Sequence, residues 1–140
     1  MMLADAAQAA EGKLYILGGG WSITGPAPSP SAIALLIQVP WDRTNVEHSF
    51  RVELIDSDGD AVVLETEAEG PHPVVIEGAI EVGRPPGIKP VTPIDVPLGI
   101  NDGALPLAPG GRYEWRLSID GESHEDWRLA FSTRPAGASS

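Results

Sequence analysis

The chain has 140 residues, of which 20 are Asp or Glu and 9 are Lys or Arg, so its formal net charge is −11. Such a charge repels phosphate backbones and anionic lipid, which argues against nucleic acid or a membrane as the partner. The absence of cysteine excludes disulfides and thiolate metal sites. We expect one domain over residues 1–134, a flexible tail over 135–140, and a cytoplasmic protein, since no leader-like or membrane-spanning run is present.

The N-terminal segments predict a hairpin. Residues 1–10 are rich in alanine, which favours helix, but the Glu-Gly-Lys that follows can form a tight turn. We therefore expect a strand that is joined to a second strand over 13–18. That strand runs into Gly18, Gly19 and Gly20, which would suit a phosphate loop only if a helix followed. Prolines 26, 28 and 30 oppose a helix there, so the glycines predict a strand end.

Alternating apolar residues predict most of the remaining strands, because successive side chains of a strand point to opposite faces. The 14 prolines and 16 glycines fall between these short runs, as is typical of an all-β domain. Pro97 cannot donate a ladder hydrogen bond, so its strand should lie at a sheet edge. With the N-terminal hairpin, about eight or nine strands are expected, those after the hairpin lying over 33–39, 49–54, 61–66, 74–82, 94–100, 112–119 and 127–132.

One local motif sharpens the fold class. The stretch LAPGGRY, residues 107–113, resembles the L-x-P-G-x-x-Y tyrosine corner of fibronectin type III and immunoglobulin-like domains. In that motif the tyrosine hydroxyl bonds to backbone just upstream. The resemblance implies an immunoglobulin or fibronectin type III-like antiparallel β-sandwich, with Tyr113 at the corner, and it implies no particular function.

The polar clusters do not form a recognisable catalytic or metal motif. The stretch DSDGD, Asp56 to Asp60, is typical of a hairpin turn. A calcium loop would need glycine at its sixth position, where Ala61 stands, although weak calcium binding remains an alternative. His48, His72 and His124 lie far apart in sequence, so we expect surface histidines rather than a metal triad. No cofactor, no metal and no enzymatic activity are predicted.

The tryptophans and one loop supply the candidate binding residues. Trp115 and Trp127 fall on apolar faces and are expected in the core, whereas Trp21 and Trp41 stand where strands meet loops. Each of the latter pair is either an exposed interface residue or a lid over one end of the sandwich. The proline-rich loop over 83–93 carries Arg84, which either joins a recognition patch or pairs with a local carboxylate. The candidate binding residues are Trp21, Trp41, Asp42, Arg43 and Arg84.

Several stretches along the whole chain also resemble a family of small bacterial proteins, common in actinobacteria, with no assigned activity. The matching segments are AQAAEGKLYILGGGW, VPWDRTN, VELIDSDGDAV, EVGRPPG and LAPGGRYEWRLSIDG. This resemblance implies an immunoglobulin-like sandwich in a bacterial cytoplasm and transfers no catalytic residue. The resulting hypothesis is a non-catalytic protein-interaction or assembly module, with a protein partner or self-association through an edge strand. The alternative is a small-ligand module, carbohydrate-like in specificity, that uses Trp21 and Trp41 as stacking platforms.

Overall fold

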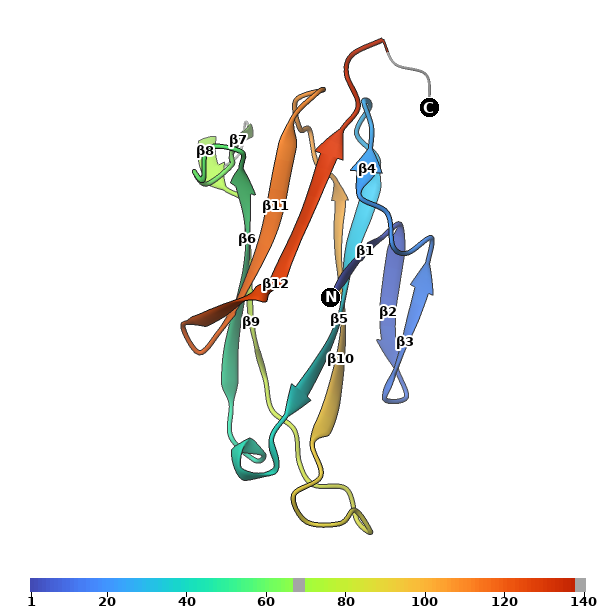
Figure 1. Cartoon of the computed structure of the whole chain (residues 1–140), viewed down its shortest axis with the longest axis vertical. Helices are drawn as coiled ribbons and strands as arrows, with labels where there is room; N and C mark the ends of the chain where they lie inside the picture. The colour runs from blue at the N-terminus through green and yellow to red at the C-terminus, as the bar shows by residue number, and fades with distance from the viewer. Residues whose placement is uncertain (67–69, 138–140) are drawn as a thin grey trace.

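The computed structural model describes residues 1–66 and 70–137 (Figure 1). In these residues the chain is all-β apart from one 3-10 turn. The elements are β1 (Met2–Ala4), β2 (Ala6–Ala10), β3 (Lys13–Leu17), β4 (Ile23–Thr24), β5 (Pro30–Val39), η1 (Trp41–Arg43), β6 (His48–Asp56), β7 (Val63–Thr66), β8 (Gly70–Pro73), β9 (Val75–Ile80), β10 (Ile94–Ala104), β11 (Arg112–Ile119) and β12 (Glu122–Thr133). The predicted all-β class is confirmed.

Two larger sheets pack across one core. Their strand orders are β4-β12-β11-β6-β9 and β1-β5-β10, and the connection over 81–93 crosses from the first sheet to the second at the lower end of the molecule (Figure 1). The alternation predicted for 33–39, 49–54 and 112–119 places their apolar faces together. The buried core consists of Leu3, Ile33, Leu35, Val52, Leu54, Trp115, Leu117 and Phe131.

The hairpin predicted for the N-terminal segments is confirmed as β2 and β3, which pair antiparallel around Glu11 and Gly12. Both turn residues have positive φ, 54° and 72°, as a two-residue hairpin turn requires. The hairpin forms a third layer against the outer side of the β1-β5-β10 sheet, where small side chains allow the backbones to approach. A Cβ added at Gly99 would lie 2.8 Å from the carbonyl oxygen of Ala7, and the Asn101 amide also bonds to both backbone groups of Ala7.

Two predicted turns have the expected form. The strand that leads into the three glycines ends at Leu17, and the short strand β4 rather than a helix follows them. At the other site, Asp56 Oδ1 accepts hydrogen bonds from the amides of Asp58 and Asp60 at 2.9 and 3.0 Å. The strand end and the DSDGD turn are therefore confirmed.

The sheet edges agree with one prediction and correct another. Pro97 lies in β10, an edge strand of its sheet, as its missing N–H predicted. The expectation of a purely antiparallel arrangement is wrong, because β4 pairs parallel with the end of β12. Strands β1, β4 and β8 were not predicted. Each has at most four residues, which is too short to show an alternating pattern.

The tyrosine corner is present as a chain path but not as the expected hydrogen bond. In the described residues no hydrogen bond is recorded for the Tyr113 hydroxyl, and its ring packs over Gly111 and tilts against Phe131 at 5.7 Å. The buried hydroxyl of Thr133 instead links the end of β12 to the backbone of residues 108–111. It donates to the Ala108 carbonyl at 2.7 Å and accepts from the Gly111 amide at 2.8 Å. The expected C-terminal tail is described through Gly137, and residues 138–140 lie outside the described residues.

Candidate functional site

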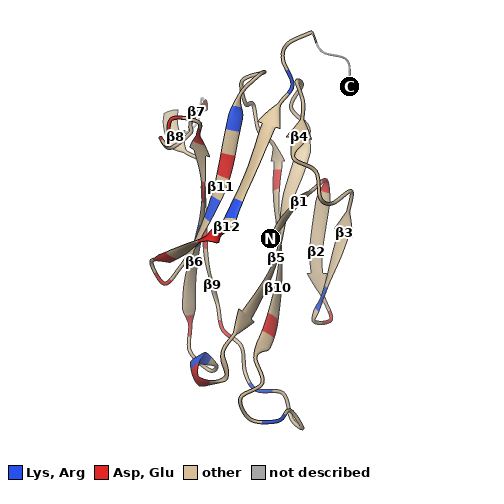
Figure 2. Ribbon diagram, viewed as in Figure 1, with Lys and Arg blue, Asp and Glu red and all other residues tan. Residues whose placement is uncertain are grey.

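Four of the five candidate binding residues come together at the lower end of the molecule. Trp41, Asp42 and Arg43 form η1, and Arg84 comes from the connection between β9 and β10. Figure 2 shows that basic and acidic segments lie at this end of the molecule. The Arg84 guanidinium lies 4.1 Å from the centroid of the Trp41 ring, an attractive cation–π geometry. It also donates to the Trp41 carbonyl at 2.6 Å and to Thr44 Oγ1 at 2.7 Å. Of the two alternatives for Arg84, pairing with a carboxylate is not seen in the described residues, where its partners are two neutral oxygens and a ring face.

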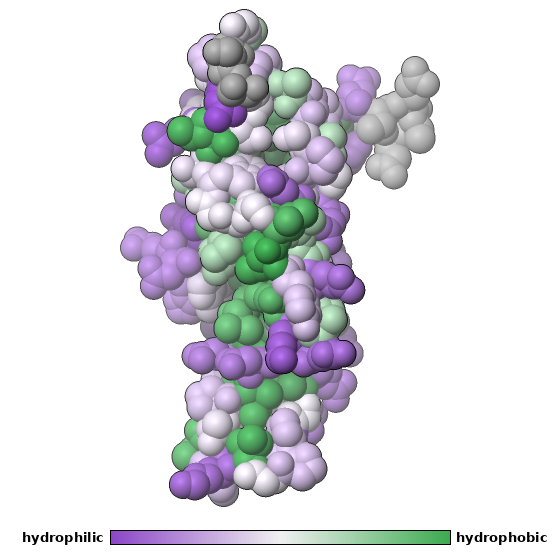
Figure 3. Space-filling view, turned by 90° about the vertical axis from the view of Figure 1, so that its right-hand side faces the viewer, coloured by the Kyte–Doolittle hydropathy of each residue, from purple (hydrophilic) through white to green (hydrophobic). Residues whose placement is uncertain are grey.

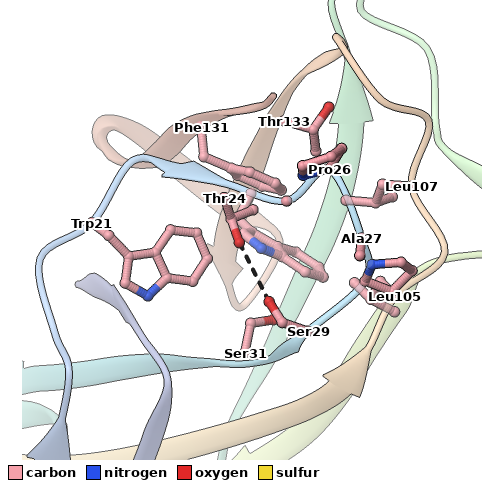
Figure 4. A pocket seen from close by; sticks show the side chains of 13 residues that line it. Trp21, Thr24, Pro26, Ala27, Ser29, Ser31, Leu105, Leu107, Phe131 and Thr133 are labelled. Carbon is pink, nitrogen blue, oxygen red and sulfur yellow. Dashed lines mark hydrogen bonds between the residues drawn. The ribbon is translucent and has the colours of Figure 1, made fainter. Parts of the chain in front are cut away.

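Trp21 lies elsewhere. It is half-buried, packs against the core, and meets Phe131 edge to face at 6.2 Å. Figure 4 shows it beside a small cavity near β4, whose volume is about 30 Å³. A cavity of that size holds little more than a water molecule. Of the two readings of Trp21, the lid over the core agrees with the structure.

A groove of about 680 Å³ lies between the two sheets. One wall is the second half of β5, and the other is the start of β12. Its floor is apolar and includes Leu117 and Ile119 of β11. Arg43 also lines the groove, so the groove and the patch around Trp41 form one continuous surface. We call this surface the open side.

The β5 wall of the open side has an unpaired edge. On the side away from β10, strand β1 covers β5 only at Ala32–Ala34, and no described strand pairs with β5 beyond that point. Leu3 directs its carbonyl away from β5, toward the amide of Gly20. The backbone groups of Met2 and Ala4 must then face β5, and those of Ala34 face β1 in return. Every second residue of a strand directs its amide and carbonyl to the same side, so those of Leu36 and Gln38 also point to this edge.

The pairing with β10 supports the same orientation. Pro97 stands opposite Leu36, and proline has no N–H to exchange in a hydrogen-bonded pair. Leu36 and Pro97 are therefore a non-hydrogen-bonded pair, whose backbone groups point away from each other. Two successive N–H and C=O pairs, at Leu36 and Gln38, are left open on the edge that borders the groove.

The β12 wall is acidic. Glu122 and Asp126 are exposed, line the groove, and have no ion-pair partner among the described residues. Trp127 is half-buried and also lines the groove, so its predicted place in the core is only partly right. The alternation of apolar residues showed that Trp127 lies on an apolar face, but it could not show that this face borders the open side. The acidic pair was missed because nothing in the sequence places β12 across from β5.

His48 and Asp120 close the lower end of the groove. His48 is 8% exposed, and its Nδ1 lies 2.6 Å from Asp120 Oδ2 while its Nε2 lies 2.8 Å from the Arg43 carbonyl. The hydrogen bonds to the Arg43 carbonyl and to Asp120 raise the pKa of His48, and the bond from His48 lowers the pKa of Asp120. Because both ring nitrogens face acceptors, the imidazolium form fits, and neither nitrogen is free to act as a base.

The histidines do not gather into a metal site. His72 contacts the Gly70 carbonyl at 3.0 Å, and the His124 ring meets Trp127 edge to face at 4.4 Å. Within residues 1–66 and 70–137 no three His, Asp or Glu side chains are grouped as metal ligands. The prediction of surface histidines is wrong for His48, which is buried.

A second exposed feature lies on the N-terminal hairpin. Figure 3 shows apolar residues gathered on the side of the molecule that carries this hairpin. On β3, Tyr15, Ile16 and Leu17 are 50, 40 and 69% exposed. Exposed apolar groups of this kind are common at protein contacts.

Comparison with known proteins shows the family but adds no activity. No curated protein and no solved structure matches the chain significantly. In the part of the chain that the structure describes, no helix is long and apolar enough to cross a membrane. A family model, described as a family of unknown function (DUF6941), matches residues 1–132. The chain therefore belongs to this family, DUF6941.

Proposed function

We propose that the protein is a non-catalytic module that binds another protein through its open side. The observation that carries the proposal is the groove of about 680 Å³, whose apolar floor lies between an unpaired strand edge and an acidic wall. Grooves of this size that combine apolar side chains with polar groups occur at binding sites. A net charge of −11 favours a protein partner over nucleic acid.

The patch around Trp41 belongs to the same proposed interface. Arg84 is exposed, yet its stacking on Trp41 and its two hydrogen bonds hold it in one place. A side chain held in this way presents its charge at little entropic cost. Tryptophan and arginine are also the residues that most often dominate protein interfaces.

Native mass spectrometry of the tagged protein from its host cells tests this proposal. We expect a stoichiometric complex that is weakened in Trp41→Ala and Arg84→Ala variants whose circular dichroism is unchanged. Lys89→Ala is the matched control, because it removes a charge from the same connection without touching the Trp41 ring. A bare monomer for the wild-type protein, under conditions that preserve known complexes, would contradict the proposal.

The finer assignments have specific support. Two sheets on one core, and a corner-like path at 107–113, support an immunoglobulin-like sandwich. A cytoplasmic bacterial setting rests on the cysteine-free composition and on the sequence resemblance. The engaged ring nitrogens of His48 support a structural rather than catalytic role.

Two alternatives are less well supported by the geometry. Carbohydrate stacking on Trp21 has only a cavity of about 30 Å³ beside it, and Arg84 covers one face of Trp41. A sugar panel followed by tryptophan fluorescence tests this reading. Self-association has its best surface on β3, where Leu17 is 69% exposed, and Leu17→Lys would then abolish the dimer in sedimentation experiments.

A further inference from the structure

We propose that the open side receives its partner by strand addition: a basic-flanked, extended segment with alternating apolar residues pairs with β5 at Leu36 and Gln38. The inference rests on the proposed function, which it deepens by naming the mode of binding and the chemistry of the partner segment. Three features of the open side carry it, namely the edge, the floor and the charge of the opposite wall.

The edge supplies the main-chain hydrogen bonds. Leu36 and Gln38 direct their amides and carbonyls away from β10, and β1 ends its pairing at Ala34. An added strand would therefore continue the line of β1. Exposed strand edges are commonly protected by charge, proline or a covering loop. From Ser31 to Trp41 the chain carries no charged residue, and Leu36 is 55% exposed, so this edge lacks the charge that usually prevents pairing.

The floor selects the side chains of the added strand. Alternate residues of a strand in this place would point between the sheets, toward Leu117, Ile119 and the half-buried Trp127. The groove volume of about 680 Å³ accommodates several aliphatic side chains. Apolar residues at every second position of the partner segment would bury this floor.

The opposite wall selects the charge. Glu122 and Asp126 have exposed carboxylates without ion-pair partners in the described chain, whereas Asp120 is already bound to His48. The basic side chains of the lining are Arg43, His48 and His124. Lysine or arginine residues that flank the apolar core of the segment would complement this wall. A second copy of the chain fits less well, because each copy carries a net charge of −11.

A set of synthetic peptides tests the inference by calorimetry and by NMR of the intact protein. The test peptide is KKVTVTVKK. Its controls are EEVTVTVEE, which reverses the charge, and KKSTSTSKK, which keeps the charge and removes the apolar residues. We expect both controls to bind at least about tenfold more weakly, a difference of about 1.4 kcal/mol. Equal binding by KKSTSTSKK would show attraction by charge alone, and no binding by KKVTVTVKK would also overturn the inference.

Two protein variants locate the site. Gln38→Pro removes an N–H that faces the free edge, a position where proline is tolerated in strands, and it should weaken KKVTVTVKK at least about tenfold. Gln38→Thr keeps the N–H and is the matched control. Glu122→Gln combined with Asp126→Gln should lower the affinity and reduce its salt dependence. Unchanged binding by a folded Gln38→Pro variant would exclude pairing at this edge.

The outcome separates this inference from the proposed function. A natural protein partner that binds wild type and Gln38→Pro equally would overturn strand addition and leave the interaction module standing. If the protein alone forms a dimer, and the Gln38→Pro variant does not, a second copy of the chain fills the site. That result would contradict a basic partner segment. If no natural protein partner is found, the proposed function itself is contradicted.

Discussion

His48 Nδ1 donates to Asp120 Oδ2 over 2.6 Å, and this contact joins β6 to the turn between β11 and β12. The two residues are 72 positions apart in the chain. Asp120 Oδ1 also accepts from the Ser49 amide at 3.0 Å. The pair thus holds the turn against its neighbouring strand and sets the lower end of the groove.

The first prediction concerns pH. The folded-state pKa of His48 is raised above 6.5, so its contribution to stability is full below pH 6.5 and is lost as the pH rises through the raised pKa. The pKa of Asp120 is lowered below 3.8, so its contribution is present above pH 3.8 and is lost as the pH falls through the lowered pKa. We therefore expect the free energy of unfolding, measured in urea, to fall as the pH is raised above 6.5.

The variants for this prediction are His48→Gln and His124→Gln. The decrease above pH 6.5 should be smaller in His48→Gln than in wild type and unchanged in His124→Gln, because the His124 side chain lies on the exposed part of β12. An identical pH dependence for wild type and His48→Gln would contradict the assigned role of the pair.

Asp102 gives a second pH effect, which has the same sign as that of His48 but begins at a lower pH. Its Oδ2 is buried without a hydrogen-bond partner among the described residues, and burial raises its pKa to about 7. The folded state keeps the proton longer than the unfolded state, so Asp102 destabilises the fold increasingly as the pH rises from about 4 to about 7. Asp102→Asn should raise the free energy of unfolding at pH 8 by about 1–2 kcal/mol, after allowance for the carboxyl's partial contact with water.

Chemical denaturation at pH 4 and pH 8 measures this effect. The gain from Asp102→Asn should be smaller at pH 4, where the native carboxyl is protonated. Asp95→Asn, an exposed change on the same strand, is the control. An equal gain at both pH values would show that burial of the charge is not its cause.

The third prediction tests how the N-terminal hairpin is held. A Cβ at Gly99 would lie 2.8 Å from the Ala7 carbonyl oxygen, so Gly99→Val should push β2 away from β10. We expect a loss of about 1–3 kcal/mol and faster amide exchange in 6–17. Gly83→Ala is a suitable control, because the added Cβ would meet only Asn45 Oδ1 at 3.5 Å. Unchanged exchange in the hairpin would contradict the observed packing.

The fourth prediction compares Thr133 with Tyr113. Thr133→Val leaves the Ala108 carbonyl and the Gly111 amide without their buried partner, which should cost about 1–3 kcal/mol. Thr133→Ser keeps the hydroxyl and should cost less. Tyr113→Phe should change stability by no more than about 0.5 kcal/mol. A large loss of stability in Tyr113→Phe, measured by thermal unfolding, would show that the Tyr113 hydroxyl makes the hydrogen bond of the expected tyrosine corner.

The strands were predictable because their signal is local. Alternation in 33–39 and 112–119 shows which face is apolar, and Pro97 marks an edge through its missing N–H. The patch around Trp41 was also proposed from local features, since a stiff connection and a basic residue stand out on an acidic chain. The three-residue strand β1 carries no such signal, although its length decides how much of β5 stays unpaired.

The open side was not predictable, because it depends on the register between distant strands. Alternation assigned Trp127 to an apolar face, but only the placement of β12 against β5 shows that this face borders a groove. His48 and Asp120 meet for the same reason. Such contacts follow from the pairing of β6 with β11, in which Phe50 stands opposite Ile119.

Amide hydrogen exchange of residues 35–39, with and without KKVTVTVKK, tests the central claim most directly. In the free protein, the amides of Leu36 and Gln38 should exchange rapidly, while those of Leu35 and Ile37, which face β10, should be protected. Addition of the peptide should protect Leu36 and Gln38 selectively. Strong protection of both amides in the free protein, or rapid exchange that persists in the bound state, would contradict an open strand edge as the binding site.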